Sequence, residues 1–136
     1  MPETPIDGTI IIETLERAAE VCEDPSGRVY ERLFRAHPEF ETLFALDTDG
    51  GVRGSMLQTA FDCLIDLAGE GRTAPAILSS ERMNHYSYGV PAETFESFFA
   101  AIRDTVCELN GEAWGDRQAR EWSRLLRRVD AEIGEN

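Results

Sequence analysis

One stretch of the sequence decides how the chain must be organised: Asn84-His85-Tyr86-Ser87-Tyr88-Gly89-Val90-Pro91, continuing into Glu93-Thr94-Phe95. It contains His85, one of only two histidines. A Gly-Val-Pro break separates the helix-like run that ends near His85 from a longer, Phe-rich run, since the residue before a proline disfavours helical backbone. A neutral imidazole at such a break can coordinate a metal through one nitrogen while a backbone carbonyl orients the other. Taken alone, a capping or core histidine is the better interpretation of this position.

The second histidine, His37, stands directly before Pro38. A residue before proline is pushed out of the helical region, so this pair predicts a helix boundary. We interpret His37 as a structural residue at the entry to the next helix. Two histidines and scattered cysteines do not make a typical structural zinc site.

Length and charge limit the classes of function. The chain has 136 residues, 42% of them apolar, which favours one domain with its own core. We expect a polar lead-in over residues 1–8 and a single domain over residues 9–136. The net charge is −13 and all 13 basic residues are arginines. Such a surface repels phosphate backbones and anionic lipids, so we predict no nucleic-acid partner and no membrane partner.

The three cysteines, Cys22, Cys63 and Cys107, are widely separated. Each lies in an apolar, helix-like run, where a free cysteine behaves as a small hydrophobe. An odd, unpaired set of this kind is typical of a reducing compartment. The N-terminus has no basic segment and no long apolar core, so we expect a cytoplasmic protein.

Apolar residues recur at helical spacing along the whole chain, and no segment alternates with period two. Proline and glycine mark the breaks between these runs. The pattern predicts an all-α domain of about seven helices, which cover residues 10–22, 25–36, a short piece after Pro38, 52–68, 75 to about 85, 91–109, and about 114 or 116–133. For the first of these helices we expect Thr9 to be the N-cap.

Three segments together resemble the globin family, in particular single-domain bacterial haemoglobins and the globin domains of flavohaemoglobins. The run from Val29 to Phe44 is similar to the second and third globin helices, with a Tyr-x-x-Leu-Phe pattern followed by His-Pro-Glu and Leu-Phe. The stretch from His85 to Phe95 resembles the turn after the iron-binding histidine, and Ala113 to Leu126 resembles the last helix. The similarity spans about residues 10 to 133 and implies a globin fold around a haem pocket.

The resemblance implies roles for individual residues. His85 would be the proximal ligand of the iron in haem b, and Phe44 would wedge against the ring. Tyr30 would be the distal tyrosine, whose hydroxyl could donate a hydrogen bond worth roughly 1–3 kcal/mol to bound dioxygen. The remaining cofactor contacts implied in the same way are Phe40, Val90, Phe95 and Phe98.

The distal position on the helix over residues 52–68 stays open. Helical phase favours Met56, with Ala60 one turn later, and Leu57 is the neighbouring choice. Arg53 would be more usual chemically. The resting coordination of the iron and the oligomeric state also stay open.

The function implied is reversible binding of dioxygen, or of nitric oxide or another small ligand, at the haem iron. Conversion of nitric oxide and dioxygen to nitrate is chemically available, but it would need a separate reductase, so we do not predict an enzyme. Glu81 departs from the family pattern, because globins usually carry an apolar residue one turn before the proximal histidine. A haem-free, globin-like sensor or protein-interaction module is therefore the alternative.

Overall fold

A computed structural model describes the backbone of residues 6–44, 46–69, 71–87 and 93–134, and their side chains except at positions 43, 82–87, 93, 133 and 134. The described residues form helices and no strand, so the predicted all-α class is confirmed. The elements in chain order are α1 (Gly8–Val21), α2 (Ser26–Ala36), the 3-10 segment η1 (Pro38–Phe44), α3 (Gly51–Ala68), α4 (Ala74–Ser87), α5 (Glu93–Asn110), the 3-10 segment η2 (Gly111–Ala113) and α6 (Asp116–Gly134).

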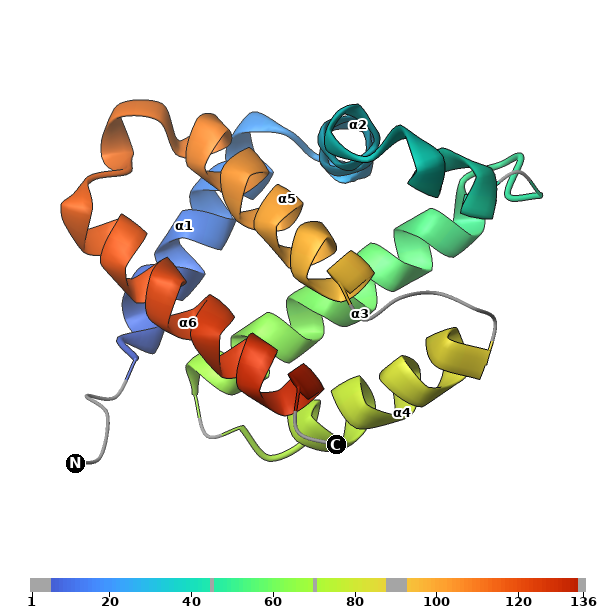
Figure 1. Cartoon of the computed structure of the whole chain (residues 1–136). Coiled ribbons are helices and arrows are strands. Elements are labelled where there is room, and N and C mark those ends of the chain that lie inside the picture. Colours follow the sequence, from blue (N-terminus) through green and yellow to red (C-terminus); the bar gives the residue numbers. More distant parts are fainter. Residues whose placement is uncertain (1–5, 45, 70, 88–92, 135–136) are drawn as a thin grey trace.

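The longest helices make the body of the domain. Helix α5 packs against α1, α2 and α6, while α3 packs against α1, α4 and α6 (Figure 1). Helix α4 lies at the edge of this assembly and packs mainly on α3 and α6. None of the described helices is long and apolar enough to cross a membrane.

The start of α1 corrects the predicted cap. Asp7, not Thr9, is the N-cap residue, and its Oδ1 accepts a hydrogen bond from the Thr9 amide at 3.1 Å. The Asp7 amide in turn donates to Glu121 Oε1 at 2.9 Å, which ties the start of α1 to α6. Aspartate is as good a cap as threonine, and the helix simply begins two residues earlier than expected.

The core contains one polar junction among its apolar side chains. The Trp122 indole donates to Thr14 Oγ1 at 2.9 Å, and Asn110 Nδ2 donates to the carbonyls of Thr14 and Val106 at 2.9 and 2.8 Å. Trp122 and Thr14 are fully buried. Because buried polar groups are costly unless they are paired, this junction fixes one register of α1, α5 and α6. The three cysteines are free, as predicted.

Candidate functional site

A mainly apolar cavity of about 220 Å³ lies between α2, η1, α3, α4 and α5. Five aromatic side chains line it, two from the α2–η1 segment and three from α5. The complete lining is Tyr30, Leu33, Phe44, Ser55, Met56, Thr59, Ala60, Cys63, Ile77, Leu78, Glu81, Thr94, Phe95, Phe98 and Phe99. Broad aromatic faces with few polar groups suit a flat apolar ligand.

Tyr30 is the centre of the aromatic wall. Its ring centroid lies 5.8 Å from that of Phe34, 5.5 Å from Phe44 and 5.5 Å from Phe98. Only 3% of the residue is exposed. Edge and offset contacts at these separations are the favoured arrangements of aromatic rings, so the Tyr30 ring is held from three sides.

The hydroxyl of Tyr30 has a defined partner. It donates to the backbone carbonyl of Arg53, in the first turn of α3, at 3.0 Å. Burial raises the pKa of this phenol well above its ordinary value of 10.0; Arg53 acts in the opposite direction and Asp47 adds to the rise. The phenol therefore keeps its proton at any physiological pH and joins α2 to the start of α3.

Asp47 holds the first turn of α3 in place. Its carboxylate accepts hydrogen bonds from the amides of Val52 and Arg53, at 3.0 and 2.9 Å, and from Arg53 Nε at 3.1 Å. Arg53 Nη2 also donates to the Asp47 carbonyl at 2.9 Å. Burial acts to raise the pKa of Asp47, but the hydrogen bonds and the guanidinium outweigh it and keep the pKa below 3.8. We call this arrangement the Asp47–Arg53 clamp.

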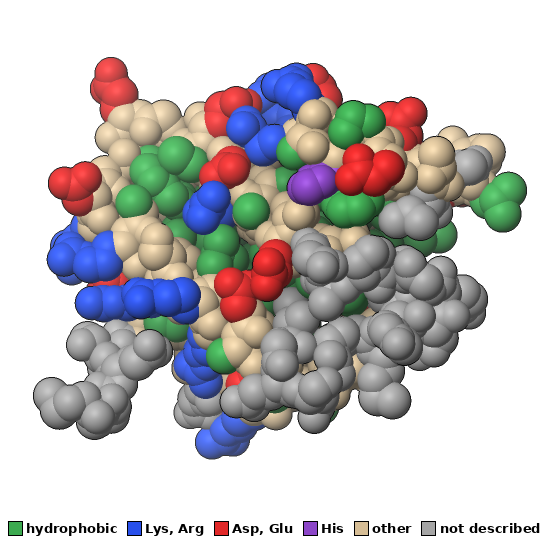
Figure 2. Space-filling model, viewed as in Figure 1, with side chains coloured by type: hydrophobic (Ala, Val, Ile, Leu, Met, Phe, Trp, Pro, Cys, Tyr) green, Lys and Arg blue, Asp and Glu red, His purple; other side chains and the backbone are tan. Residues whose placement is uncertain are grey.

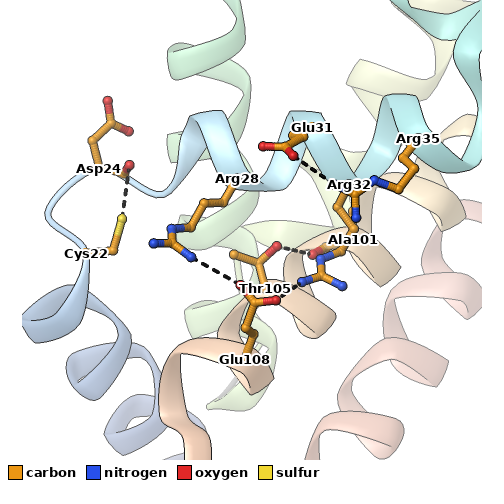
Figure 3. Close-up of polar contacts among 9 residues, drawn as sticks. All are labelled: Cys22, Asp24, Arg28, Glu31, Arg32, Arg35, Ala101, Thr105 and Glu108. Atoms are coloured by element: carbon orange, nitrogen blue, oxygen red, sulfur yellow. Dashed lines mark hydrogen bonds and ion pairs between the residues drawn. The ribbon is translucent and has the colours of Figure 1, made fainter.

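Ion pairs join α2 to α5 outside the cavity. Arg28 Nη1 and Arg32 Nη2 approach the two carboxylate oxygens of Glu108 at 3.2 and 2.6 Å (Figure 3). Exposed ion pairs contribute little stability, so packing must supply most of the energy. The pairs join the same two helices that bring Tyr30 of α2 against Phe98 of α5.

Helix α4 supplies the wall opposite α3. Ile77, Leu78 and Glu81 line the cavity from this helix. Its first turn is held by Asp66 of α3, whose carboxylate accepts hydrogen bonds from the amides of residues 72, 73 and 74 at 3.3, 3.1 and 2.8 Å. The backbone of α4 continues as helix to Ser87, so position 85 follows Glu81 by one turn and Leu78 by two. The helix face that borders the cavity therefore includes position 85.

Six of the predicted cofactor contacts meet at this cavity: Tyr30, Phe44, Met56, Ala60, Phe95 and Phe98. Leu57 is buried but lines a second cavity of about 300 Å³, which lies between α1, α2, α3 and α5. Arg53 is engaged in its clamp with Asp47. Val90 and the side chain of His85 lie outside the described residues, so their predicted contacts stay predictions.

Phe40 is buried in a different setting from the one predicted. Its ring stacks on the imidazole of His37, with centroids 4.6 Å apart. The imidazole also lies 3.3 Å from Glu39 Oε1 through Nδ1 and 3.1 Å from Ser97 Oγ through Nε2. His37 therefore joins η1 to α5, in agreement with its predicted structural role, and Phe40 supports that joint.

Several lining residues carried no signal in the sequence. Cys63 is one: burial raises the pKa of its thiol to about 11, and the charges of Asp62, Asp66 and Glu81 add to the rise. Thr94 is another; its Oγ1 is buried and has no hydrogen-bond partner among the described residues. From helical phase alone, they are ordinary core positions. They can be identified as lining residues only when the positions of the helix axes are known.

The described lining of the cavity suits a large flat ring better than a bare metal ion. Among the described side chains, no group of three His, Cys, Asp or Glu residues could hold a metal. The cavity instead offers aromatic and aliphatic faces, and one wall helix carries a histidine on the bordering face. The described lining therefore fits a flat, largely apolar ring such as haem.

One face of the molecule shows how charged side chains are distributed over part of the described surface (Figure 2). On the face shown in Figure 2, arginines and acidic side chains are interspersed with small apolar areas.

The model of the globin family matches residues 27–133 of the chain. The match includes α2, all the walls of the cavity and most of α6. A search of curated proteins finds no matching relative.

Proposed function

This chain belongs to the globin family, and from that premise we propose that it binds haem b in the cavity described above, through His85, and binds dioxygen or another diatomic ligand there. Globins typically bind haem. The observation that carries the proposal is the aromatic cavity, whose α4 wall continues in helical register to position 85.

Different side chains of the cavity would make different contacts with the ring. Phe44, Phe95 and Phe98 would pack against its faces and exclude water, while Met56 and Ala60 would border the ligand side from α3. His85 and Val90 would complete the opposite side. Phe40 and Leu57 would support the wall from behind, since both are buried away from the cavity.

The iron of the bound haem would supply the site for a diatomic ligand. The protein would supply a largely apolar surrounding, which keeps water away from the ligand and strengthens each polar contact made there. Oxidation of nitric oxide would in addition need electrons from a separate reductase, so binding is the activity that we propose for the chain itself.

The two histidines provide a matched test. Wild type, His85→Ala and His37→Ala should be purified, incubated with haemin and examined for a Soret band. We expect the band in wild type and in His37→Ala, because His37 contacts Phe40 and Ser97 outside the cavity. In His85→Ala the band should be lost or strongly shifted, and added imidazole should restore it in part. An unchanged spectrum in His85→Ala would refute the role of His85.

One observation favours a second candidate. Glu81 lines the cavity, where a carboxylate disfavours burial of an apolar ring. A haem-free globin-like module is the function consistent with that feature. It predicts a colourless protein that does not take up haemin, so the same spectra decide between the two.

A further inference from the structure

We propose that Tyr30 locks α2 to α3 and does not donate to the ligand, so that this globin favours weakly polar diatomic ligands such as carbon monoxide over dioxygen more than a donor tyrosine would allow. This inference rests on the proposed haem site. It assigns the site a ligand class from the hydrogen bonds of its own wall.

The first step concerns the hydroxyl hydrogen. A phenol carries one hydrogen, and in Tyr30 it is directed to the Arg53 carbonyl at 3.0 Å. The ring cannot easily swing away, because three aromatic neighbours hold it at centroid separations of 5.5 to 5.8 Å. The donor is thus occupied in the resting structure.

The second step concerns the acceptor. The Arg53 carbonyl belongs to the turn that the Asp47–Arg53 clamp fixes through four hydrogen bonds of 2.9 to 3.1 Å. Because both partners are held, the bond between Tyr30 and Arg53 is preorganised. A ligand would have to compete with it for the hydrogen and also leave the carbonyl with one partner fewer.

The third step concerns the ligand. With its hydrogen engaged, the Tyr30 hydroxyl has only lone pairs to offer a ligand. A ligand that takes on negative charge when it binds gains no stabilisation from lone pairs, whereas a weakly polar ligand loses little. The remaining hydroxyls of the α3 wall are Ser55 and Thr59, and these could serve a polar ligand.

The lock itself is tested on haem-free protein. With tyrosines labelled, we expect a slowly exchanging hydroxyl proton in the NMR spectrum of wild type that is absent from Tyr30→Phe. Phe34→Leu is the matched control, since it removes a ring contact and leaves the hydrogen bond; it should keep the proton. Rapid exchange in wild type, or loss of the proton in Phe34→Leu, would overturn the lock.

The ligand class is tested on haem-loaded protein. Dioxygen dissociation from Tyr30→Phe should be within about twofold of wild type, and the carbon–oxygen stretching frequency of the carbon monoxide complex should not move. A donating tyrosine would make dissociation from the variant about tenfold faster or more, and that result would overturn the inference. If no haem binds, the proposed function fails, while the NMR result still decides whether the lock exists.

Discussion

At both ends of α3 an aspartate carboxylate accepts hydrogen bonds from backbone amides, but the structural consequences differ. Before its start, Asp47 accepts hydrogen bonds from the amides of Val52 and Arg53. Near its end, Asp66 accepts hydrogen bonds from the amides of residues 72, 73 and 74, where the chain enters α4. Asp47 is buried and paired with a guanidinium, whereas Asp66 is only partly buried. The start of α3 is therefore fixed together with Arg53 and Tyr30, while the loop to α4 is held mainly by one carboxylate.

This difference separates the two walls of the cavity. The α2–α3 wall is specified by a chain of contacts from Asp47 through Arg53 to Tyr30. The α4 wall, which carries position 85, is attached through its first turn and through packing on α3 and α6. We expect the α4 wall to respond first when the domain is perturbed.

The largest effect should follow from Asp47→Ala. The substitution removes the acceptor of three hydrogen bonds and leaves the Arg53 guanidinium without its carboxylate. We expect thermal unfolding to move down by about 8 °C, the combined effect of a lost cap and a lost ion pair in a domain of this size. Asp49→Ala is the matched control in the same loop, because Asp49 is exposed and, among the described residues, accepts a hydrogen bond only from the Gly51 amide. Equal shifts in the two variants would remove the distinction that we draw for Asp47.

A smaller effect should follow from Asp66→Ala, with a local character. We expect a decrease in Tm of about 4 °C, and amide exchange should accelerate more in α4 than in α2 or α3. Asp62→Ala, one turn earlier, serves as the control because Asp62 is exposed and its one hydrogen bond to a described residue comes from Gln58. Uniform acceleration in all helices would show that Asp66 acts on global stability and does not specifically anchor α4.

The smallest effect should appear in the pH dependence. Hydrogen bonds, that from the Ala74 amide first and then those from Thr73 and Arg72, lower the pKa of Asp66 below 3.8 against the effect of burial, and Asp47 is lowered as well. A carboxylate whose folded pKa is depressed stabilises the fold above its unfolded pKa. This contribution is lost as the pH falls through the folded pKa.

Urea midpoints should therefore decline below about pH 4 in wild type. The decline should be shallower in Asp66→Asn and in Asp47→Asn, because asparagine does not titrate. Parallel pH profiles for wild type and both variants would mean that neither carboxylate is stabilised by folding.

Most of the fold could be predicted because prolines and glycines mark the boundaries between its helices. Pro25, Pro38 and the Gly69–Gly71 segment all lie at observed helix boundaries. The miss at Thr9 is small, since any of several polar residues can cap a helix and the sequence does not say which one is aligned.

Predicted site residues line the cavity in the segments that are regular α-helix. Tyr30, Met56 and Ala60 follow α-helical phase and line the cavity. Phe40 and Phe44 were both expected to contact the cofactor, but η1 is a 3-10 segment, in which residues four apart diverge by about 120°. Phe44 therefore reaches the cavity while Phe40 turns toward His37.

The carboxylates at the ends of α3 could not be predicted as anchors. Asp47 and Asp66 reach amides five to eight residues further along the chain, across loops. Hydrogen bonds across a loop of this kind leave no periodic pattern in a sequence. The chain contains 26 acidic residues, and nothing in the sequence distinguishes these two from the rest. The partner of the Tyr30 hydroxyl is a backbone carbonyl, which no side-chain pattern reveals.

The most direct test of the proposed haem site is the absorption spectrum of the reduced, haemin-treated protein with and without carbon monoxide. The account predicts a Soret band that sharpens and shifts when carbon monoxide is added, because the aromatic cavity would hold haem b with an open ligand side. A protein that shows no Soret band after haemin treatment and gel filtration would contradict it.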